Sequence, residues 1–331
     1  MLRIGIIGSG FGLIGLMPAF RGIKGAKIVA ICSRKVSPLP YKDTKIYSHW
    51  KTMLDKKILD AVVIAVPPHA QYKIAKSAIK KGINVFAEKP LAANLKEARE
   101  LFVLAKREGI VHGMDFEFPE VAEWKKVKKL LDRNAYGKLN HVSVNWDWMS
   151  GHLLNRRKNW KTNVAQGGGV LAYYFSHGLN YLEHFAGEIT DAKSAFTYSP
   201  LSLGGGEVGV DLLLKFKNAT GSAHVSCNSP GLIRHQLIFY CERGVVVLEN
   251  RNSIVDNFQI RTYTNSGQSH VKVRKDKGRR GEDERAKIVR ILADRFVKAC
   301  AGKGKMYPTF AEGLRTHELI EKIRTNTNRI K

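Results

Sequence analysis

Hydrophobic and polar positions in the first third of the chain alternate between short apolar runs and longer stretches with helical spacing. Apolar runs that each predict a buried β-strand occur at residues 2–8, 26–33, 59–68, 83–90 and 110–118. Between them, apolar positions three and four residues apart predict helices, most clearly at residues 71–82 and 95–109. Because almost wholly apolar strands that alternate with helices are covered on both faces, this pattern predicts a doubly wound parallel sheet of the Rossmann type.

Beyond residue 118 the pattern changes to strands that follow one another. Runs rich in β-branched and aromatic residues, joined by Gly, Asn and Ser turns, occur at residues 141–150, 207–217, 219–229, 235–250 and 257–264. Strands without intervening helices predict a large, mostly antiparallel open sheet, and helical spacing returns at residues 282–302 and 310–327. We therefore expect an α/β protein with a nucleotide-binding domain at 1–118 and a second α/β domain at 119–331.

A glycine-rich turn follows the first predicted strand and precedes a helix. Glycines in such a turn let the backbone bend tightly and approach a pyrophosphate at the helix N-terminus. We expect contacts to a dinucleotide from Gly8, Ser9, Gly10, Phe11, Gly12 and Leu13. The third glycine of the common spacing is displaced, since position 13 is leucine. The alternative is a glycine turn in an α/β domain that binds no nucleotide.

The second predicted strand ends without a carboxylate. An acidic residue at this point usually binds the free 2′-hydroxyl of NAD. Here the strand ends in Ser33 and Arg34, which suit a 2′-phosphate through charge-assisted hydrogen bonds. The sequence thus favours NADP over NAD, and the competing interpretation is a solvated basic loop.

Two further strand ends carry residues suited to a cofactor site. Ligands of doubly wound sheets bind beyond the carboxyl ends of the strands. We expect Val66 and Pro67 to border the cofactor there, together with Glu88 and Lys89. A lysine beside a nicotinamide can hydrogen-bond a substrate hydroxyl and stabilise a developing alkoxide. Alternatively, Glu88 and Lys89 are surface neighbours ahead of a proline that ends the strand.

The segments GIIGSGFG, AVVIAVPP and NVFAEKPLA, followed by QGGGVL, His177 and YLEHFAGEI, resemble the glucose–fructose oxidoreductase, inositol dehydrogenase and rhizopine-catabolism family. The resemblance covers nearly the whole chain. It implies a Rossmann domain, a C-terminal domain whose open sheet mediates self-association, and hydride transfer between NAD(P) and a carbon of a sugar, cyclitol or related ring. Lys89 matches the family's lysine and His177 its active-site histidine, which suits proton transfer.

One position departs from the family pattern. Many members carry aspartate four residues before the histidine, where this chain has Tyr173. Either His177 works without that carboxylate, or Tyr173 supplies a phenol whose pKa is lowered by Lys89. Tyr173 is also suited to simple packing. We assign substrate contacts to Tyr173, His177, Phe116 and Trp160, the last as a stacking surface for a sugar ring.

Composition limits the partners. The chain has 55 Lys and Arg against 29 Asp and Glu, a formal net charge of +26. Because no zinc-finger or RNP-like pattern accompanies this charge, we expect no nucleic acid as main partner. An anionic or nucleotide-linked sugar would fit it. Four separated cysteines and the lack of an apolar run of roughly 20 residues predict a cytoplasmic protein without a membrane span.

These observations together predict an NAD(P)-dependent dehydrogenase or reductase that acts on CH–OH or C=O groups of a sugar-like molecule. His49, His69 and His112 have no partner at ligand spacing, so we expect no metal. Three alternatives remain open: a tetrapyrrole reductase similar to biliverdin reductase, a glycosidase that uses NAD transiently, and a non-catalytic regulator that binds the cofactor.

Overall fold

The computed structural model describes residues 1–33, 44–56, 58–275 and 277–326, which form two compact units. The first unit comprises Met1–Glu117 and Lys277–Arg315, and the second comprises Phe118–Asp276 and the chain from Thr316 onward. The first break lies next to the boundary expected at residue 118. The sequence-based division, however, puts residues 277–315 in the second domain, whereas the structure packs them in the first.

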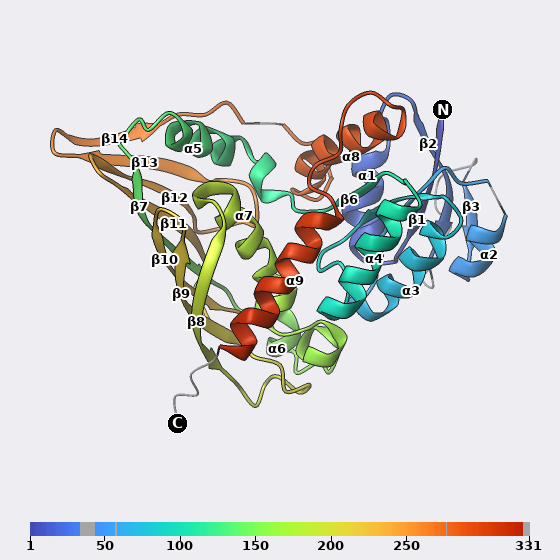
Figure 1. Ribbon diagram of the computed structural model, residues 1–331, viewed down its shortest axis with the longest axis horizontal. Helices are drawn as coiled ribbons and strands as arrows, with labels where there is room; N and C mark the ends of the chain where they lie inside the picture. The colour runs from blue at the N-terminus through green and yellow to red at the C-terminus, as the bar shows by residue number, and fades with distance from the viewer. Residues whose placement is uncertain (34–43, 57, 276, 327–331) are drawn as a thin grey trace. The chain divides into compact units, whose positions relative to one another are not determined.

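The first unit contains a six-stranded parallel sheet with strand order β3-β2-β1-β4-β5-β6 (Figure 1). This confirms the predicted doubly wound sheet. Its strands are β1 (Leu2–Ile7), β2 (Ala26–Cys32), β3 (Lys45–Tyr47), β4 (Ala61–Ile64), β5 (Asn84–Ala87) and β6 (His112–Met114). Its helices are the π-helix η1 (Gly12–Leu16), α1 (Met17–Phe20), α2 (Trp50–Asp55), α3 (Pro68–Ile79), α4 (Leu95–Arg107), α8 (Ala286–Cys300) and the first part of α9 (Phe310–Thr325).

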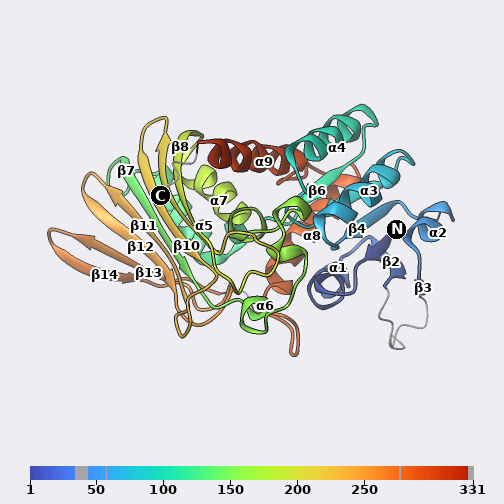
Figure 2. The ribbon, with the colours of Figure 1, turned by 90° about the horizontal axis from the view of Figure 1, so that it is seen from below.

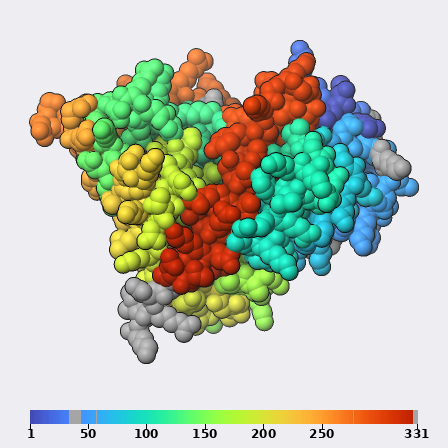
Figure 3. Space-filling model, viewed as in Figure 1, coloured from blue at the N-terminus to red at the C-terminus, as the bar shows by residue number. Residues whose placement is uncertain are grey.

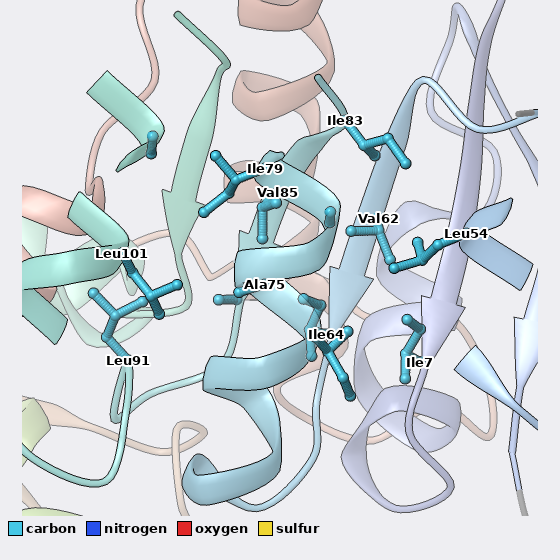
Figure 4. Packing of buried hydrophobic residues seen from close by; sticks show 14 of the residues in the cluster. Ile7, Leu54, Val62, Ile64, Ala75, Ile79, Ile83, Val85, Leu91 and Leu101 are labelled. Carbon is cyan, nitrogen blue, oxygen red and sulfur yellow. The ribbon is translucent and has the colours of Figure 1, made fainter. Parts of the chain in front are cut away.

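Apolar side chains cover both faces of this sheet. On one face, α3 and α4 pack against the strands through Ile79, Leu101 and Val85 among others (Figure 4). On the other face, Phe296 of α8 meets Phe86 edge-on, with ring centroids 5.6 Å apart. The apolar stripe of α8 is therefore buried against the sheet, which explains why residues 277–315 belong to this unit.

Helix α4 begins where the sequence predicts it. Asn94 precedes the helix, and its side chain accepts a hydrogen bond from the backbone N–H of Glu97 at 2.9 Å. This cap satisfies one of the N–H groups that a helix leaves unpaired at its start. The outer side of α4 forms part of the molecular surface (Figure 3), where Val103 is 57% exposed. Among the described helices, none is both long and apolar enough to cross a bilayer.

The second unit contains an eight-stranded sheet with strand order β14-β13-β12-β11-β7-β10-β9-β8 (Figure 2). Neighbouring strands are antiparallel except β7 and β10, which confirms the predicted large, mostly antiparallel sheet. The strands are β7 (Leu139–Asp147), β8 (Ile189–Thr197), β9 (Gly209–Phe216), β10 (Thr220–Ser226), β11 (Arg234–Cys241), β12 (Gly244–Asn250), β13 (Gln259–Thr264) and β14 (Gly267–Val271). The helices are η2 (Phe118–Glu120), α5 (Ala122–Asp132), α6 (Gly151–Leu154), η3 (Trp160–Thr162), η4 (Val164–Gln166), the π-helix η5 (Val170–Tyr174) and α7 (Ser176–Ala186).

This sheet has one buried and one exposed face. Along β9 the burial alternates, so that Leu212 and Leu214 are buried while Leu213 between them is 65% exposed. On the buried face, Phe185 of α7 packs against Phe239 of β11 with ring centroids 4.9 Å apart. Helix α7, which carries His177, is thus fixed on the sheet by its apolar side.

Candidate active site

The strand ends of the first unit lie in one row. Ile7 pairs in register with Cys32 and with Ile64, Ile64 with Ala87, and Ala87 with Met114. Because these strands are parallel, the residues that follow each of them meet at the same edge of the sheet. The glycine turn after β1, Ser33 after β2, Val66 and Pro67 after β4, Lys89 after β5 and Glu117 after β6 are thereby brought to that edge.

The glycine turn leaves room for a dinucleotide. Gly8 has φ +135°, and a Cβ there would lie 2.1 Å from the carbonyl oxygen of Ala65, so only glycine fits. At Gly10 a Cβ would meet nothing within 4 Å, so the space beside this backbone is open. Ser9 is exposed, and the N–H of Leu13 donates to the Gly10 carbonyl at 3.0 Å. This open turn fits the close approach of a pyrophosphate.

Packing does not require the displaced glycine of the motif, Gly12. A Cβ at Gly12 would meet its neighbours at ordinary distances of 3.5 Å or more. A Cβ at Gly15, which the sequence interpretation did not single out, would lie 2.1 Å from the ring of Phe11. The guanidinium of Arg285 lies over the ring of Phe11, 4.2 Å from its centroid. Phe11 is therefore packed in place and shapes the turn.

The predicted 2′-phosphate contacts are described only in part. Ser33 follows β2 and is buried, and its backbone N–H donates to the carbonyl of Tyr47 at 3.2 Å. Arg34 lies outside the described residues. The preference for NADP therefore stays a prediction.

The loop that carries Lys89 is held by a glutamine. The side-chain amide of Gln71, on α3, donates to the carbonyl oxygens of Glu88, Pro90 and Leu91 at 2.5, 3.0 and 3.2 Å. Gln71 is 1% exposed, and the Lys89–Pro90 peptide bond is cis. The backbone N–H of Lys89 also donates to the Glu88 carboxylate at 3.1 Å. These bonds fix the backbone from which the lysine projects.

Three carboxyl groups cluster beyond β5 and β6. Asp115 and Glu117 are 1% and 5% exposed, and Glu88 is partly buried beside them. Burial raises the pKa of Asp115 well above its usual value, and the neighbouring Glu88 raises it further. Burial and Glu88 likewise raise the pKa of Glu117 to about 7. Burial also raises the pKa of Glu88, against the opposing effect of Lys89. Groups with such perturbed pKa values are typical of functional sites.

Phe116, proposed as a substrate contact, has its side chain in the hydrophobic core of the first unit. It is 2% exposed and belongs to the same apolar cluster as Leu91 and Met114. Phe116 thus lies in the apolar core, whereas Asp115 and Glu117 on either side of it belong to the carboxyl cluster. This placement favours packing over substrate contact for Phe116.

In the second unit, two residues of the triple-glycine segment lie too close to neighbouring groups to carry a side chain. A Cβ at Gly168 would lie 2.2 Å from the carbonyl oxygen of Trp160, and one at Gly169, where φ is +87°, would lie 2.3 Å from the carboxylate of Glu207. Glu207 is 4% exposed and pairs with Arg324 at 2.9 Å. It also accepts a hydrogen bond from the N–H of Leu171 at 3.3 Å. The glycines therefore let the chain bend around a buried ion pair.

Tyr173 and His177 follow this segment on two different kinds of helix. Tyr173 lies in the π-helix η5, and its N–H donates to the Gly169 carbonyl at 2.9 Å. His177 lies in the first turn of α7, is 6% exposed, and meets the ring of Phe118 edge-on at 5.0 Å. The four-residue spacing suggests one α-helix that carries both side chains, but the two residues lie on different helices. Short π-helices occur often at functional sites.

A row of aromatic rings runs through the second unit. Successive ring centroids lie 4.8 Å apart for Trp160–Tyr173, 4.1 Å for Tyr173–Tyr174 and 4.5 Å for Tyr174–Trp148. The ammonium of Lys161 lies 4.8 Å from the Tyr173 ring centroid. We call these four rings the aromatic row. Trp160 and Tyr173, both proposed as substrate contacts, are thus brought together, with a cation beside them.

Polar groups accompany the aromatic row. The hydroxyl of Ser150 lies 2.7 Å from Nδ1 of His152 and 3.3 Å from the hydroxyl of Tyr174. Burial lowers the pKa of His152 to about 4, and the charge of Lys161 contributes in the same direction. Burial raises the pKa of the Tyr174 phenol. A neutral imidazole and a neutral phenol at this position can both hydrogen-bond hydroxyl groups.

Sequence reasoning missed several of these residues. Gln71 and Arg324 belong to no recognisable motif, and the residues that they bind, Glu88 and Glu207, lie far from them in the sequence. Asp115 did have a signal, because residues 114–117 alternate apolar and acidic directly after a strand. In the described part of the chain, no three His, Cys, Asp or Glu side chains are arranged to hold a metal ion.

Comparison with known families covers both units. Residues 2–116 match the family described as the oxidoreductase family with an NAD-binding Rossmann fold. Residues 124–247 match the GFO/IDH/MocA C-terminal domain. The two matches together take in most of the chain, including the glycine turn, Lys89 and His177.

Curated relatives are similar over part of their length. An uncharacterised oxidoreductase of Synechocystis sp. is 33% identical over 195 residues, which cover 56% of this chain and 52% of that protein. The levoglucosan dehydrogenase of Pseudarthrobacter phenanthrenivorans is 25% identical over 239 residues, which cover 65% of this chain and 59% of that protein. The chain thus spans little more than half the length of these relatives.

A solved structure of levoglucosan dehydrogenase in complex with NADH and L-sorbose has the same fold. The two structures match with a TM-score of 0.84 at 19% sequence identity, over 98% of this chain and 96% of that chain. At this identity the likeness shows a shared architecture for both units.

Proposed function

The chain belongs to the GFO/IDH/MocA family of oxidoreductases with an NAD-binding Rossmann fold, and from this we propose that it transfers a hydride between a nicotinamide dinucleotide and a carbon of a sugar or sugar derivative. The observation that carries the proposal is the row of strand ends in the first unit. It brings the open glycine turn and Lys89 to one edge of a doubly wound sheet. Ligands of such sheets bind at that edge.

Residues of the glycine turn would hold the cofactor's pyrophosphate, with Val66, Pro67 and Glu88 beside it. A bound nicotinamide would supply or accept the hydride. We propose NADP as the preferred form, supported by the absence of a carboxylate directly after β2 and by Ser33 and Arg34 at that position. NAD is the alternative, and the solved levoglucosan dehydrogenase is a complex with NADH.

Lys89 is proposed to polarise the substrate oxygen. Its ammonium can donate a hydrogen bond to a carbonyl or hydroxyl and stabilise the alkoxide character that develops as hydride moves. The three hydrogen bonds from Gln71 support this role, because they fix the loop backbone. A fixed donor needs no reorganisation during the reaction.

His177 and Tyr173 are the candidates for proton transfer at the substrate. An imidazole is suited to accept or donate a proton near neutral pH, since its unperturbed pKa is about 6.5. Tyr173 lies beside Lys161, and a neighbouring cation stabilises a phenolate. We propose that His177 acts together with Lys89 in proton transfer, and that Tyr173 is a hydrogen-bonding partner of the substrate.

A sugar suits the second unit. Sugars stack their apolar faces on aromatic rings and hydrogen-bond through their hydroxyls, and the aromatic row with Ser150 and His152 offers both. The name of levoglucosan dehydrogenase, an anhydrosugar enzyme, agrees with this class. The surplus of positive charge favours an anionic or nucleotide-linked sugar. We further propose self-association through the exposed sheet face, where Leu213 projects.

The test is a cofactor and substrate screen with a matched pair of lysine variants. NADH and NADPH binding are measured by fluorescence, and turnover is followed in both directions with a panel of aldoses, ketoses and anhydrosugars, levoglucosan included. Lys89→Met should lower kcat about 10²-fold or more while cofactor binding persists. Lys96→Met, the same change at an exposed position of α4, should have no effect.

Two outcomes would contradict parts of this proposal. Unchanged turnover in Lys89→Met would exclude the lysine from the chemistry. Tighter binding of NADH than of NADPH would exclude the 2′-phosphate contacts, while leaving hydride transfer intact. Absence of any cofactor binding to the wild type would overturn the proposed activity altogether.

A further inference from the structure

The buried carboxyl cluster of the first unit consists of Glu88, Asp115 and Glu117, and the proposed mechanism uses none of them for proton transfer. Asp115 lies deepest, 1% exposed, at the end of β6 and directly beside the end of β5 that leads to Lys89. Its own backbone N–H donates to the carbonyl of Ala87 at 3.0 Å. The carboxyl group is thereby fixed behind the lysine loop.

The partner of the Asp115 carboxyl is another carboxyl. Glu88 lies close enough that its charge raises the pKa of Asp115. Within the described residues, no N–H or O–H donor lies within reach of either Asp115 carboxylate oxygen. A buried carboxylate that accepts no hydrogen bond carries the full cost of desolvation, and two neighbouring carboxylates offer each other only acceptors. Both conditions favour one proton on the Glu88–Asp115 pair.

The charges around the pair point the same way. Three carboxyl groups are faced by two cations, Lys89 and Arg285 at the start of α8. The guanidinium of Arg285 is already bound to Asp283 through two hydrogen bonds of 2.8 Å. An ionised carboxylate buried without full compensation is costly, and protonation relieves this cost. A retained proton thus brings the cluster closer to electrical balance.

We propose that Asp115 is a positioning residue for the reaction: it holds a proton that it shares with Glu88, and this pair supplies the proton to Lys89. The inference rests on the proposed hydride-transfer function. During carbonyl reduction the carbon receives the hydride with its two electrons, and Lys89 gives a proton to the oxygen. The neutral amine then takes the proton of the Glu88–Asp115 pair, which becomes a pair of carboxylates and recovers a proton from solvent. Oxidation runs the same transfers in reverse.

Infrared spectroscopy of the protein without cofactor tests the stored proton directly. A protonated carboxyl has a C=O stretching band that a carboxylate lacks. At about pH 9, where Glu117 with a pKa of about 7 is ionised, the wild type should show this band and Asp115→Asn should lose it. Asp55→Asn, the same change at an exposed carboxylate paired with Lys81, should keep it. If Asp115→Asn does not fold, Glu88→Gln removes the other half of the pair and should change the same band.

Kinetics test the transfer to Lys89. In carbonyl reduction Asp115→Asn should lower kcat about 10²-fold and shift the alkaline fall of the pH–rate profile to lower pH. KM and NADH affinity should remain unchanged, which a general loss of structure would not allow. A missing infrared band with normal turnover, or an unchanged pH profile in Asp115→Asn, would overturn the relay alone. Absence of turnover in the wild type would overturn the relay together with the proposed function.

Discussion

Replacing His235 by phenylalanine should make the second unit more resistant to acid. His235 lies on β11 with its ring stacked on Trp146, at a centroid distance of 4.2 Å and an interplanar angle of 2°. The hydroxyl of Tyr181 lies 3.1 Å from its Nε2. The side chain is 3% exposed, and burial lowers its pKa to about 3. The folded protein therefore holds this imidazole neutral through the whole mildly acidic range.

The magnitude follows from the two pKa values. In the unfolded chain a histidine titrates at about 6.5, so below that pH the unfolded state takes up a proton that the folded state refuses. This linkage lowers the free energy of unfolding by about 2 kcal/mol between pH 7 and pH 5. Phenylalanine binds no proton, but it loses the Tyr181 hydrogen bond at a cost of about 1–2 kcal/mol at both pH values. On acidification from pH 7 to pH 5 the variant should therefore gain about 2 kcal/mol of stability relative to the wild type.

Urea unfolding followed by tryptophan fluorescence measures this difference. Of the five tryptophans, four lie in the second unit, so the signal reports mainly on that unit. His317 is also buried with a pKa of about 4, but it titrates equally in both proteins and cancels. His270→Phe, on the exposed strand β14, should follow the wild type at both pH values. Equal pH dependence of His235→Phe and wild type would refute the reasoning.

Two glycine substitutions separate packing from cofactor binding. Gly169→Ala should destabilise the protein by about 1–3 kcal/mol more than Gly187→Ala in thermal unfolding. The two glycines have similar φ angles of +87° and +85°, but only a Cβ at 169 would meet a neighbour, the Glu207 carboxylate at 2.3 Å. Equal losses of stability would rule out this close approach. Gly10→Ala should leave the unfolding temperature unchanged, because its Cβ meets nothing within 4 Å, yet weaken NADH binding at least ~10-fold by fluorescence titration; unchanged affinity would contradict the role of the turn.

Sequence reasoning could predict the candidate site of the first unit because strand ends are readable from the hydrophobic pattern. The apolar runs at residues 2–8, 59–68 and 83–90 contain the strands that end at Ile7, Ile64 and Ala87. Parallel pairing then determines that the residues after these strands meet at one edge. Gly8 and Lys89 could thus be associated without knowing any contact between them. The same reasoning could have found Asp115, because residues 114–117 alternate apolar and acidic directly after β6.

Other parts of the site depend on packing that no local pattern reveals. Glu207 and Arg324 are 117 residues apart, and only the folded second unit brings their charges to 2.9 Å. The helical spacing of α8 predicts an amphipathic helix but not the sheet that it covers. Its apolar stripe packs on Phe86 of the first unit. Residues 277–315 therefore return to that unit, which a single division at residue 118 does not predict. Long-range contacts of this kind depend on how the whole core packs and not on the local sequence of one segment.

The distribution of charge explains why a strongly basic chain suits an anionic cofactor without calling for nucleic acid. Every charged side chain that is buried within the described residues is acidic, and no lysine or arginine is among them. The accessible surface is therefore more positive than the net charge of +26 already indicates. Such a surface attracts anionic ligands over a distance of about 10 Å at 0.1 M salt. The buried Glu88–Asp115 pair faces the opposite requirement, because close to Lys89 it keeps one proton. Attraction of the ligand and proton storage for the reaction are thus separated between the surface and the interior of the same protein.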